Sequence, residues 1–360
     1  MKKTTLYKIH EGLGAKLIDF AGYLMPVQYS SIIAEHKAVR NSVGVFDVSH
    51  MGEIFIKGPK ALDFVQNITV NDASKLTIGR VQYSAMCYPD GGIVDDLLVY
   101  KLADDEFLLV VNASNKDKDF EWMKKNNSFG VEINDRSDDY SLLAVQGPKS
   151  KEVLSKICNK EIDLEYYHFF KAQVAGIDMI LSRTGYTGEL GYELYFEGDE
   201  SVAENLWNKL FEAGKEFGIQ PVGLGARDSL RLEMGFCLYG NDIDQTTNPL
   251  EAGLGWITKL NKECFIGKDA ILKVKSEGLK RKLIALISDE KAFPRHGYEI
   301  TSDGKVVGTI TSGTVSPILE KAIAMGYVDA NFAGVEAQLN FLIRNKEIPA
   351  KLTKLPFVKK

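Results

Sequence analysis

The feature that most constrains the fold of this chain is a short unit that occurs twice, 89 residues apart. A strand-like apolar run at 54–56 leads into Gly58-Pro59-Lys60 and a helix-like apolar pattern, and a run at 143–145 leads in the same way into Gly147-Pro148-Lys149. Proline suits the first turn of a helix, because the N–H that it lacks would have no partner there. Two copies are too few for a solenoid. They predict two similar strand-to-helix units within a mixed α+β body.

The character of the sequence changes near residue 279. An apolar strand-like run at 283–287 is followed by short strands and turns, and Asp303-Gly304 is a strong hairpin signal. We therefore predict an α+β fold that ends in a small β-barrel domain at 279–360. The rest, 1–278, is assigned to one α+β region of two interleaved lobes, the second at approximately 54–140.

The composition is typical of a soluble globular protein, with 45% hydrophobic and 26% charged residues among 360. No apolar run approaches the roughly 20 residues that cross a bilayer, and no apolar segment follows the basic start Met1-Lys2-Lys3, so we expect neither a membrane span nor a secretory signal. The four cysteines form no C-x-x-C pair, which argues against a zinc site and a disulfide framework. A cytoplasmic protein is therefore expected.

The charge is unevenly distributed. The whole chain has a net charge of −5, which argues against general nucleic-acid binding. Residues 271–360 contain 15 Lys and Arg against 9 Asp and Glu, a net charge of +6, so residues 1–270 carry −11. The basic C-terminal part is either a surface for an anionic partner or a merely solvated lysine face.

Two adjacent carboxylates, Asp95 and Asp96, follow the turn Asp90-Gly91-Gly92 at the start of an apolar strand-like run. Strand side chains alternate, so the two must point to opposite faces and at most one can face a given pocket. An acidic group near apolar surroundings is a candidate for proton handling. On this segment alone, the interpretation that both are hydrated near the turn is favoured.

Two further segments could bind a ligand. In 183–194, glycines allow close backbone approach, Tyr186 offers a stacking face, and Glu193 stands in an otherwise apolar strand. A flat heterocycle with adjacent N–H and NH2 groups would satisfy such a carboxylate, although a Glu on the wet face of a strand is the simpler interpretation. In 223–233, Arg227 and Arg231 share a helical face, and an arginine near a helix start is unfavourable for the helix dipole.

Several common sites are excluded by their missing residues. The chain has no dinucleotide fingerprint, no Walker A loop and no H-E-x-x-H. Ser49 and His50 are adjacent but no third triad member is indicated, so we expect a structural or hydrogen-bonded role for His50. Surface or cap positions are expected for the other histidines, His10, His36, His168 and His296.

Taken together, these segments resemble the glycine cleavage T-protein family, the aminomethyltransferases. The matching motifs occur in order from residue 19 to residue 317 and cover most of the chain: Asp19-x-Ala21-Gly22, 43–53, Gly91-Gly92-x-x-Asp95-Asp96, 185–193, 223–233, Asn248-Pro249, 265–268 and 311–317. Each motif is modest alone, and their order makes the set specific.

The resemblance implies the transfer of a one-carbon unit. The donor would be the aminomethyl group on the lipoyl arm of the H-protein, and the acceptor tetrahydrofolate, giving 5,10-methylenetetrahydrofolate, ammonia and the reduced lipoyl arm. The implied fold has three lobes, two of the α+β type and a C-terminal β-barrel, around a central folate-binding hole. H-proteins are generally acidic, so the basic C-terminal region is the implied docking surface of a protein that we expect to be a monomer without nucleic-acid or membrane contacts.

Carried over residue by residue, the resemblance implies that Asp96 is the catalytic carboxylate. The transfer passes through a cationic, iminium-like carbon, which a fixed carboxylate stabilises, and the same group can relay a proton. Strand alternation then leaves Asp95 structural. Glu193 is implied to bind the guanine-like edge of the pterin, and further folate contacts are implied for Met51, Tyr83, Asn112, Tyr186, Arg227 and Tyr239. Neither role needs a metal, a flavin or a nicotinamide cofactor.

Two alternatives on the same scaffold stay open. One is a folate-dependent demethylase that acts on a small methylated substrate. The other is a folate-binding paralogue of iron–sulfur cluster assembly, whose K-G-C-Y-x-G-Q-E signature partly resembles 262–268. Cys264 in that segment is expected to be a small buried hydrophobe rather than a reactive thiol.

Overall fold

The structure is a computed structural model that describes residues 1–334 and 338–359. The chain forms two compact units, and each is assembled from three segments. The first unit comprises Met1–Val65, Ala73–Tyr83 and Leu97–Asp228, and the second comprises Gln66–Asp72, Ser84–Asp96 and Ser229–Lys360.

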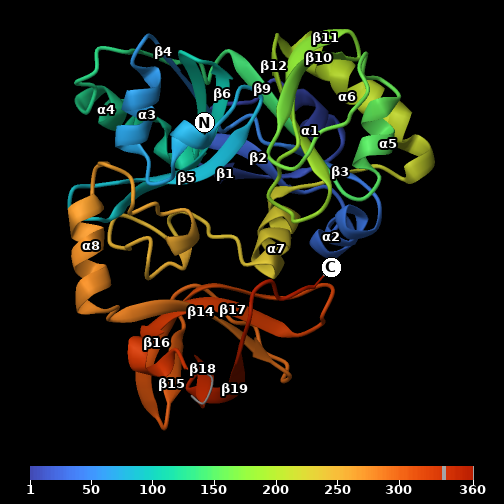
Figure 1. Ribbon diagram of the computed structural model, residues 1–360. Helices are drawn as coiled ribbons and strands as arrows, with labels where there is room; N and C mark the ends of the chain where they lie inside the picture. The colour runs from blue at the N-terminus through green and yellow to red at the C-terminus, as the bar shows by residue number, and fades with distance from the viewer. Residues whose placement is uncertain (335–337, 360) are drawn as a thin grey trace. The chain divides into compact units, whose positions relative to one another are not determined.

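The main sheet of the first unit has six strands in the order β10-β11-β12-β9-β3-β13. Their bounds are Phe169–Val174, Ile177–Ser182, Gly191–Glu197, Tyr140–Gln146, Gly44–Asp47 and Gln220–Pro221. Helices α5 (Ser150–Ser155) and α6 (Glu200–Gly214) cover one face of it (Figure 1). On β12 the side chains of Tyr192, Leu194 and Phe196 enter that core. Because strand side chains alternate, Glu193 and Tyr195 occupy the opposite face.

A second sheet has five strands in the order β5-β6-β7-β4-β8. Their bounds are Val81–Cys87, Ile93–Ala103, Glu106–Val111, Gly52–Lys57 and Glu132–Asp135, and the associated helices are α3 (Ala61–Ile68) and α4 (Lys116–Lys125). On β4, Ile54 and Ile56 are fully buried. Alternation therefore places Glu53 and Phe55 on the other face, where Phe55 stacks on Tyr140 of β9 with ring centroids 5.7 Å apart.

The predicted repeat is confirmed. Strand β4 leads through Gly58 into α3, and β9 leads through Gly147 into α5. Both glycines have strongly positive φ, +135° and +131°. A Cβ at Gly147 would lie 2.3 Å from the backbone oxygen of Ser42, so this turn needs glycine for space as well as for conformation.

The N-terminal part of the first unit is a hairpin flanked by two helices. Strands β1 (Lys16–Phe20) and β2 (Tyr23–Gln28) pair antiparallel between α1 (Tyr7–Gly12) and α2 (Ile32–Asn41). Ser31 caps α2 by accepting a hydrogen bond from the Ala34 N–H at 3.2 Å, and serine is among the residues preferred at this position. Short 3-10 turns occur in both units, at Ala73–Lys75, Ala113–Asn115, Lys215–Phe217, Leu254–Trp256 and Ala330–Phe332.

The second unit contains a closed barrel with strand order β14-β17-β16-β15-β18-β19. The bounds are Arg281–Ser288, Ala322–Asp329, Lys305–Val315, Glu299–Ser302, Leu339–Ile343 and Lys346–Thr353 (Figure 1). Helix α8 (Lys268–Glu277) precedes the barrel, and α7 (Leu224–Met234) enters the unit at Ser229. A mixed α+β fold with a C-terminal β-barrel is thus confirmed. Within the described residues, no helix is both long and apolar enough to span a membrane.

Candidate functional site

The predicted site residues are divided between the two units. Six belong to the first unit: Met51, Tyr83, Asn112, Tyr186, Glu193 and Arg227. The other two, Asp96 and Tyr239, belong to the second.

Glu193 lies on the face of β12 that points away from the core of α5 and α6, and its register partners are Ser182 of β11 and Ala144 of β9. Its Oε2 accepts hydrogen bonds from the Thr184 hydroxyl and, at 3.4 Å, from the Tyr195 hydroxyl. Burial raises the pKa of this carboxyl, while the Thr184 hydroxyl, the Arg227 cation and the Tyr195 hydroxyl act in the opposite direction. The side chain is therefore a half-buried acid whose ionised form depends on its neighbours.

Arg227 and Tyr186 lie close together in the same unit. The guanidinium carbon of Arg227 lies 4.5 Å from the centroid of the Tyr186 ring, a cation–π contact. Arg227 occupies the first turn of α7, whose start is held by a hydrogen bond of 2.9 Å from the Gly223 N–H to Glu35 Oε2. The cation–π contact with Tyr186 offsets the unfavourable position of an arginine near the start of a helix.

The remaining predicted residues of this unit have simpler surroundings. Met51 is half-buried directly before β4, and its N–H bonds to the Val48 oxygen at 3.1 Å. Asn112 follows β7 directly and precedes the turn Ala113–Asn115. Tyr83 is half-buried on β5.

Two buried polar residues flank Met51 in the sequence: His50 directly before it and Glu53 two positions after it, and sequence reasoning did not single out Glu53. Both residues are only 1% exposed, so water does not reach them readily. Among the described residues, the two carboxylate oxygens of Glu53 have no hydrogen-bond partner, and the Nδ1 of His50 has none either. Burial raises the pKa of Glu53 well above its usual range; the Lys116 cation opposes this shift, and Asp135 and Glu193 add to it. Burial, Arg227 and Lys116 lower the pKa of His50 to about 3, so it is neutral at pH 7.

A signal for Glu53 was present in the sequence. It is the acidic member of an otherwise apolar strand, Glu53-Ile54-Phe55-Ile56, which is the argument that singled out Glu193. The nearby Lys116 is also buried, and its Nζ donates to the Tyr23 hydroxyl at 2.8 Å. Together these side chains add a buried cation and a buried acid to the region of Glu193.

In the second unit, the carboxylate pair has the predicted turn in front of it. Gly91 has φ +89°, and the Gly92 N–H donates to Asp90 Oδ1 at 3.0 Å. A Cβ at Gly92 would lie 1.9 Å from the Gln245 oxygen, so the second glycine is required by close approach. Asp95 is fully buried and Asp96 is half-buried.

Tyr239 and Cys237 lie near this pair in the second unit. The Tyr239 hydroxyl donates to the Ile93 oxygen at 3.1 Å, which ties it to the start of β6. Burial raises the pKa of the Cys237 thiol, and the negative charges of Asp242 and Asp96 add to that shift. Asp96 is thus within electrostatic range of Cys237.

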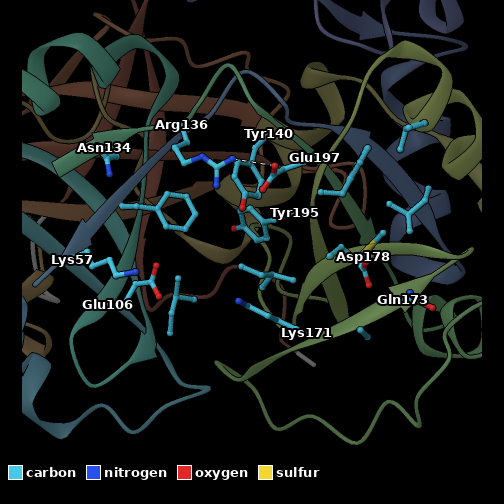
Figure 2. Close-up of a pocket in the computed structure, with 18 of the residues that line it drawn as sticks. Lys57, Glu106, Asn134, Arg136, Tyr140, Lys171, Gln173, Asp178, Tyr195 and Glu197 are labelled. Carbon is cyan, nitrogen blue, oxygen red and sulfur yellow. Dashed lines mark ion pairs between the residues drawn. The ribbon is translucent and has the colours of Figure 1, made fainter. Parts of the chain in front are cut away.

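An open cavity of about 1140 Å³ lies in the first unit, away from the predicted residues. Figure 2 shows Arg136, Tyr140 and Glu197 on one side of it, where Arg136 pairs with Glu197 at 3.0 Å. Its charges are mixed, and in the described part of the chain the predicted site residues are not among its lining. Tyr195, one of its lining residues, also contacts Glu193.

Three local expectations were wrong. Cys264 is exposed, because the neighbouring Phe265 takes the buried position. His10 and His36 are buried rather than at the surface. His10 Nε2 lies 2.8 Å from Asp47 Oδ2, a partner 37 positions away. Burial alone would raise the pKa of Asp47, but its hydrogen bonds, led by that of His10, lower the pKa to about 2.

No group of three or more His, Cys, Asp and Glu side chains within 1–334 and 338–359 is arranged to hold a metal ion.

Comparison with known proteins adds two family matches and close relatives. Residues 6–262 match the GCVT N-terminal domain, and residues 281–359 match the glycine cleavage T-protein C-terminal barrel domain. An aminomethyltransferase of Halothermothrix orenii is 53% identical over 359 residues, covering 99% of this chain and 100% of that protein. One from Flavobacterium psychrophilum is 54% identical over 363 residues and both chains are covered completely. The crystal structure of the glycine cleavage system aminomethyltransferase T from Bartonella henselae is similar with a TM-score of 0.93 at 36% identity, covering 99% of this chain and 98% of that one.

Proposed function

We propose a mechanism from one premise: this chain belongs to the glycine cleavage T-protein family and is an aminomethyltransferase of the glycine cleavage system. It transfers the methylene carbon of an aminomethyl group, carried by the lipoyl arm of the H-protein, to tetrahydrofolate. Ammonia, 5,10-methylenetetrahydrofolate and the reduced lipoyl arm are the products. The atoms balance, since the folate loses two N–H hydrogens, one to the thiol and one to ammonia.

The observation that carries the folate assignment is the carboxylate of Glu193. Its Oε2 is occupied by protein hydroxyls, and among the described residues Oε1 has no hydrogen-bond partner. A pterin presents adjacent N–H and NH2 donors, which a fixed carboxylate accepts. We assign Glu193 to that edge, with Arg227 and Tyr186 beside it as a cation and an aromatic face.

Asp96 is the proposed catalytic carboxylate. A carboxylate fixed before the reaction begins stabilises the positive charge that develops on the transferred carbon. It can also accept a proton from a folate nitrogen and pass it on. The burial of Asp95 supports its structural role on the opposite face of β6, and leaves the half-buried Asp96 as the member of the pair that can meet a substrate.

Five other folate contacts complete the proposal, and each has a role that its position supports. Met51 and Asn112 lie at the ends of β4 and β7, where they can line a ligand without disturbing the sheet. Tyr83 offers an aromatic face from β5, and Tyr239 is fixed by its bond to Ile93. Tyr186, the fifth, offers an aromatic face beside the Arg227 cation.

The H-protein is the proposed protein partner, and the basic C-terminal region its docking surface. Lys280 and Lys282 are exposed there. Arg281 between them is held by Glu251 through two hydrogen bonds, of 2.8 and 3.1 Å, so it contributes less free charge. We propose a cytoplasmic monomer with a domain boundary at 278/279.

One assay tests the proposed function directly. Purified chain, tetrahydrofolate and aminomethylated H-protein are mixed, and methylenetetrahydrofolate and ammonia are measured. We expect both products, and neither when the H-protein lacks its aminomethyl group. Folate-dependent release of a one-carbon unit from a small methylated amine, without any need for H-protein, would instead support a demethylase.

A further inference from the structure

A buried network of hydroxyl groups lies behind Glu193. It comprises Tyr100 of β6, Ser182 of β11, Thr184 in the loop after β11, and Tyr195 of β12, each at most 2% exposed. The Tyr100 hydroxyl lies 2.9 Å from that of Tyr195, 3.1 Å from that of Ser182 and 3.3 Å from that of Thr184. Thr184 Oγ1 also lies 3.0 Å from Ser182 Oγ. Hydroxyls from three strands and one loop therefore meet at one point.

The network has a direction, because each hydroxyl carries a single hydrogen. Glu193 Oε2 can only accept when ionised, and it is reached by Thr184 and Tyr195. Tyr100 and Ser182 lie behind these two: the Tyr100 hydroxyl is within hydrogen-bond distance of both, and the Ser182 hydroxyl is within hydrogen-bond distance of Thr184. Burial raises the pKa of both Tyr100 and Tyr195, so both keep their protons and act as donors at neutral pH.

We propose that Thr184, Tyr195 and Tyr100 are positioning residues for folate binding: they hold Oε2 of an ionised Glu193 so that Oε1 is presented to the pterin. This inference rests on the proposed function, which assigns Glu193 to the folate. The three residues do not touch the ligand in this proposal, and they act through the carboxylate. Hydrogen bonds to a charged acceptor are strong. In a buried site, each hydrogen bond of a chain also polarises and strengthens its neighbours.

The charges around Glu193 explain why such support is needed. Arg227 from α7 favours the ionised carboxylate of Glu193. The negative charge of Glu193 in turn disfavours the ionised form of Glu53 from β4. The phenols of Tyr166 and Tyr167, before β10, and of Tyr100 and Tyr195 complete the surroundings. A protonated Glu193 would lose an acceptor that the N–H groups of a pterin need.

The experiment compares Thr184→Val with Thr184→Ser. Valine keeps the volume and shape but removes the donor, and serine keeps the hydroxyl. Tetrahydrofolate affinity is measured by calorimetry between pH 6 and 9. For Thr184→Val we expect roughly 10-fold weaker binding at neutral pH. Removing a donor raises the pKa of Glu193, so the loss of affinity on acidification should begin about one pH unit higher than in the natural chain. Thr184→Ser should restore both values.

A second pair of variants covers the case in which Thr184→Val does not fold. Tyr195→Phe removes one hydroxyl from the network, and Tyr140→Phe removes one from a tyrosine in the same cavity wall that bonds to Glu197 instead. We expect the shifted pH profile in Tyr195→Phe alone. Equal affinities and profiles within both pairs would overturn the inference.

The variant Glu193→Gln separates this inference from the proposed function. If Glu193→Gln weakens folate binding but the hydroxyl variants do not, only the positioning role fails. If Glu193→Gln leaves the affinity unchanged, the assignment of Glu193 to the folate fails, and the positioning role fails with it.

Discussion

Two groups of buried titratable side chains, one in each unit, differ in how their polar atoms are satisfied. In the second unit, Arg231 pairs with Asp242 at 2.6 Å, and both are at most 1% exposed. Asp242 also accepts from Ser312, Thr311 and the Leu238 N–H, so both of its oxygens have partners. In the first unit, Glu53 and His50 are equally buried, yet both carboxylate oxygens of Glu53 and the Nδ1 of His50 lack a hydrogen-bond partner among the described residues.

The presence or absence of hydrogen-bond partners distinguishes a buried polar group with a structural role from one that is a candidate for binding or catalysis. A buried charge with all its partners stabilises one arrangement of the chain and has little left with which to bind a ligand. A buried polar group without partners costs stability, so its retention needs another reason, such as catalysis or binding. The pair of Arg231 and Asp242 in the second unit therefore explains the Thr311-Ser312 motif as structure, whereas we assign the polar groups near Glu193 to the proposed site.

The largest effect on stability is expected where the satisfied charges are broken. Asp242→Ala leaves the Arg231 guanidinium buried without its carboxylate, so we expect a loss of about 3–5 kcal/mol in the free energy of unfolding. Urea denaturation measures it. The control, Lys209→Ala, breaks an exposed pair with Glu212 and should cost less than about 1 kcal/mol. Comparable losses in the two variants would show that the buried pair contributes no more to the free energy of unfolding than the exposed pair does.

The next effect concerns the two neighbouring aspartates. Asp96→Asn removes the charge opposite the developing cation, so we expect kcat to fall roughly 10²–10³-fold while the urea midpoint stays unchanged. Asp95→Asn changes a fully buried group and should lower stability more than activity. Large and equal activity losses in both variants, with both folded, would contradict the assignment of different roles to the two faces of β6.

Much of the fold follows from local rules, and much of the site does not. The repeat before Gly58 and Gly147, the turn at Gly91 and the cap at Ser31 each depend on neighbouring residues alone. The hydroxyl network does not, since Tyr100 and Tyr195 are 95 positions apart and meet through strand pairing. A single sequence gives no register for such distant strands, so an isolated polar residue cannot be distinguished from a partnered one.

The same lack of strand register explains why the burial of His10 and, among the described residues, the unpartnered state of the Glu53 carboxylate were not predicted. His10 was expected at the surface because its partners Asp47 and Tyr29 come from distant segments. Glu53 is the acidic member of an apolar strand just as Glu193 is, so the local pattern marks both, but its lack of partners within the described part of the chain depends on distant segments. The family resemblance supplied roles for residues within known motifs, and it was silent about the polar groups behind them.

Removing the carboxyl group of Glu53 should change the free energy of unfolding less than Asp242→Ala does, and in the opposite direction. The pKa of Glu53 is raised in the folded chain, so folding takes up a proton and its cost grows as pH rises above the unfolded pKa, about 4.3. Glu53→Gln removes that cost. At pH 7.5 we expect the variant to be about 1–3 kcal/mol more stable than the natural chain, with little difference at pH 4. Urea denaturation at the two pH values tests this, with Glu197→Gln as the exposed control. A variant that is less stable at pH 7.5 would mean that Glu53 is ionised and stabilised by Lys116.

The smallest effect is expected at the exposed charges of the second unit, where neither kind of buried charge is involved. Reversing Lys280 and Lys282 to Glu should raise the KM for aminomethylated H-protein by roughly 3–10-fold at low salt, and the difference should shrink as salt screens the surface. The matched control is Lys346→Glu, an exposed lysine at the start of β19. The KM for tetrahydrofolate should stay constant throughout, because the folate residues proposed here are unchanged. If the double variant and the control behave alike at every salt concentration, the docking surface lies elsewhere on the chain.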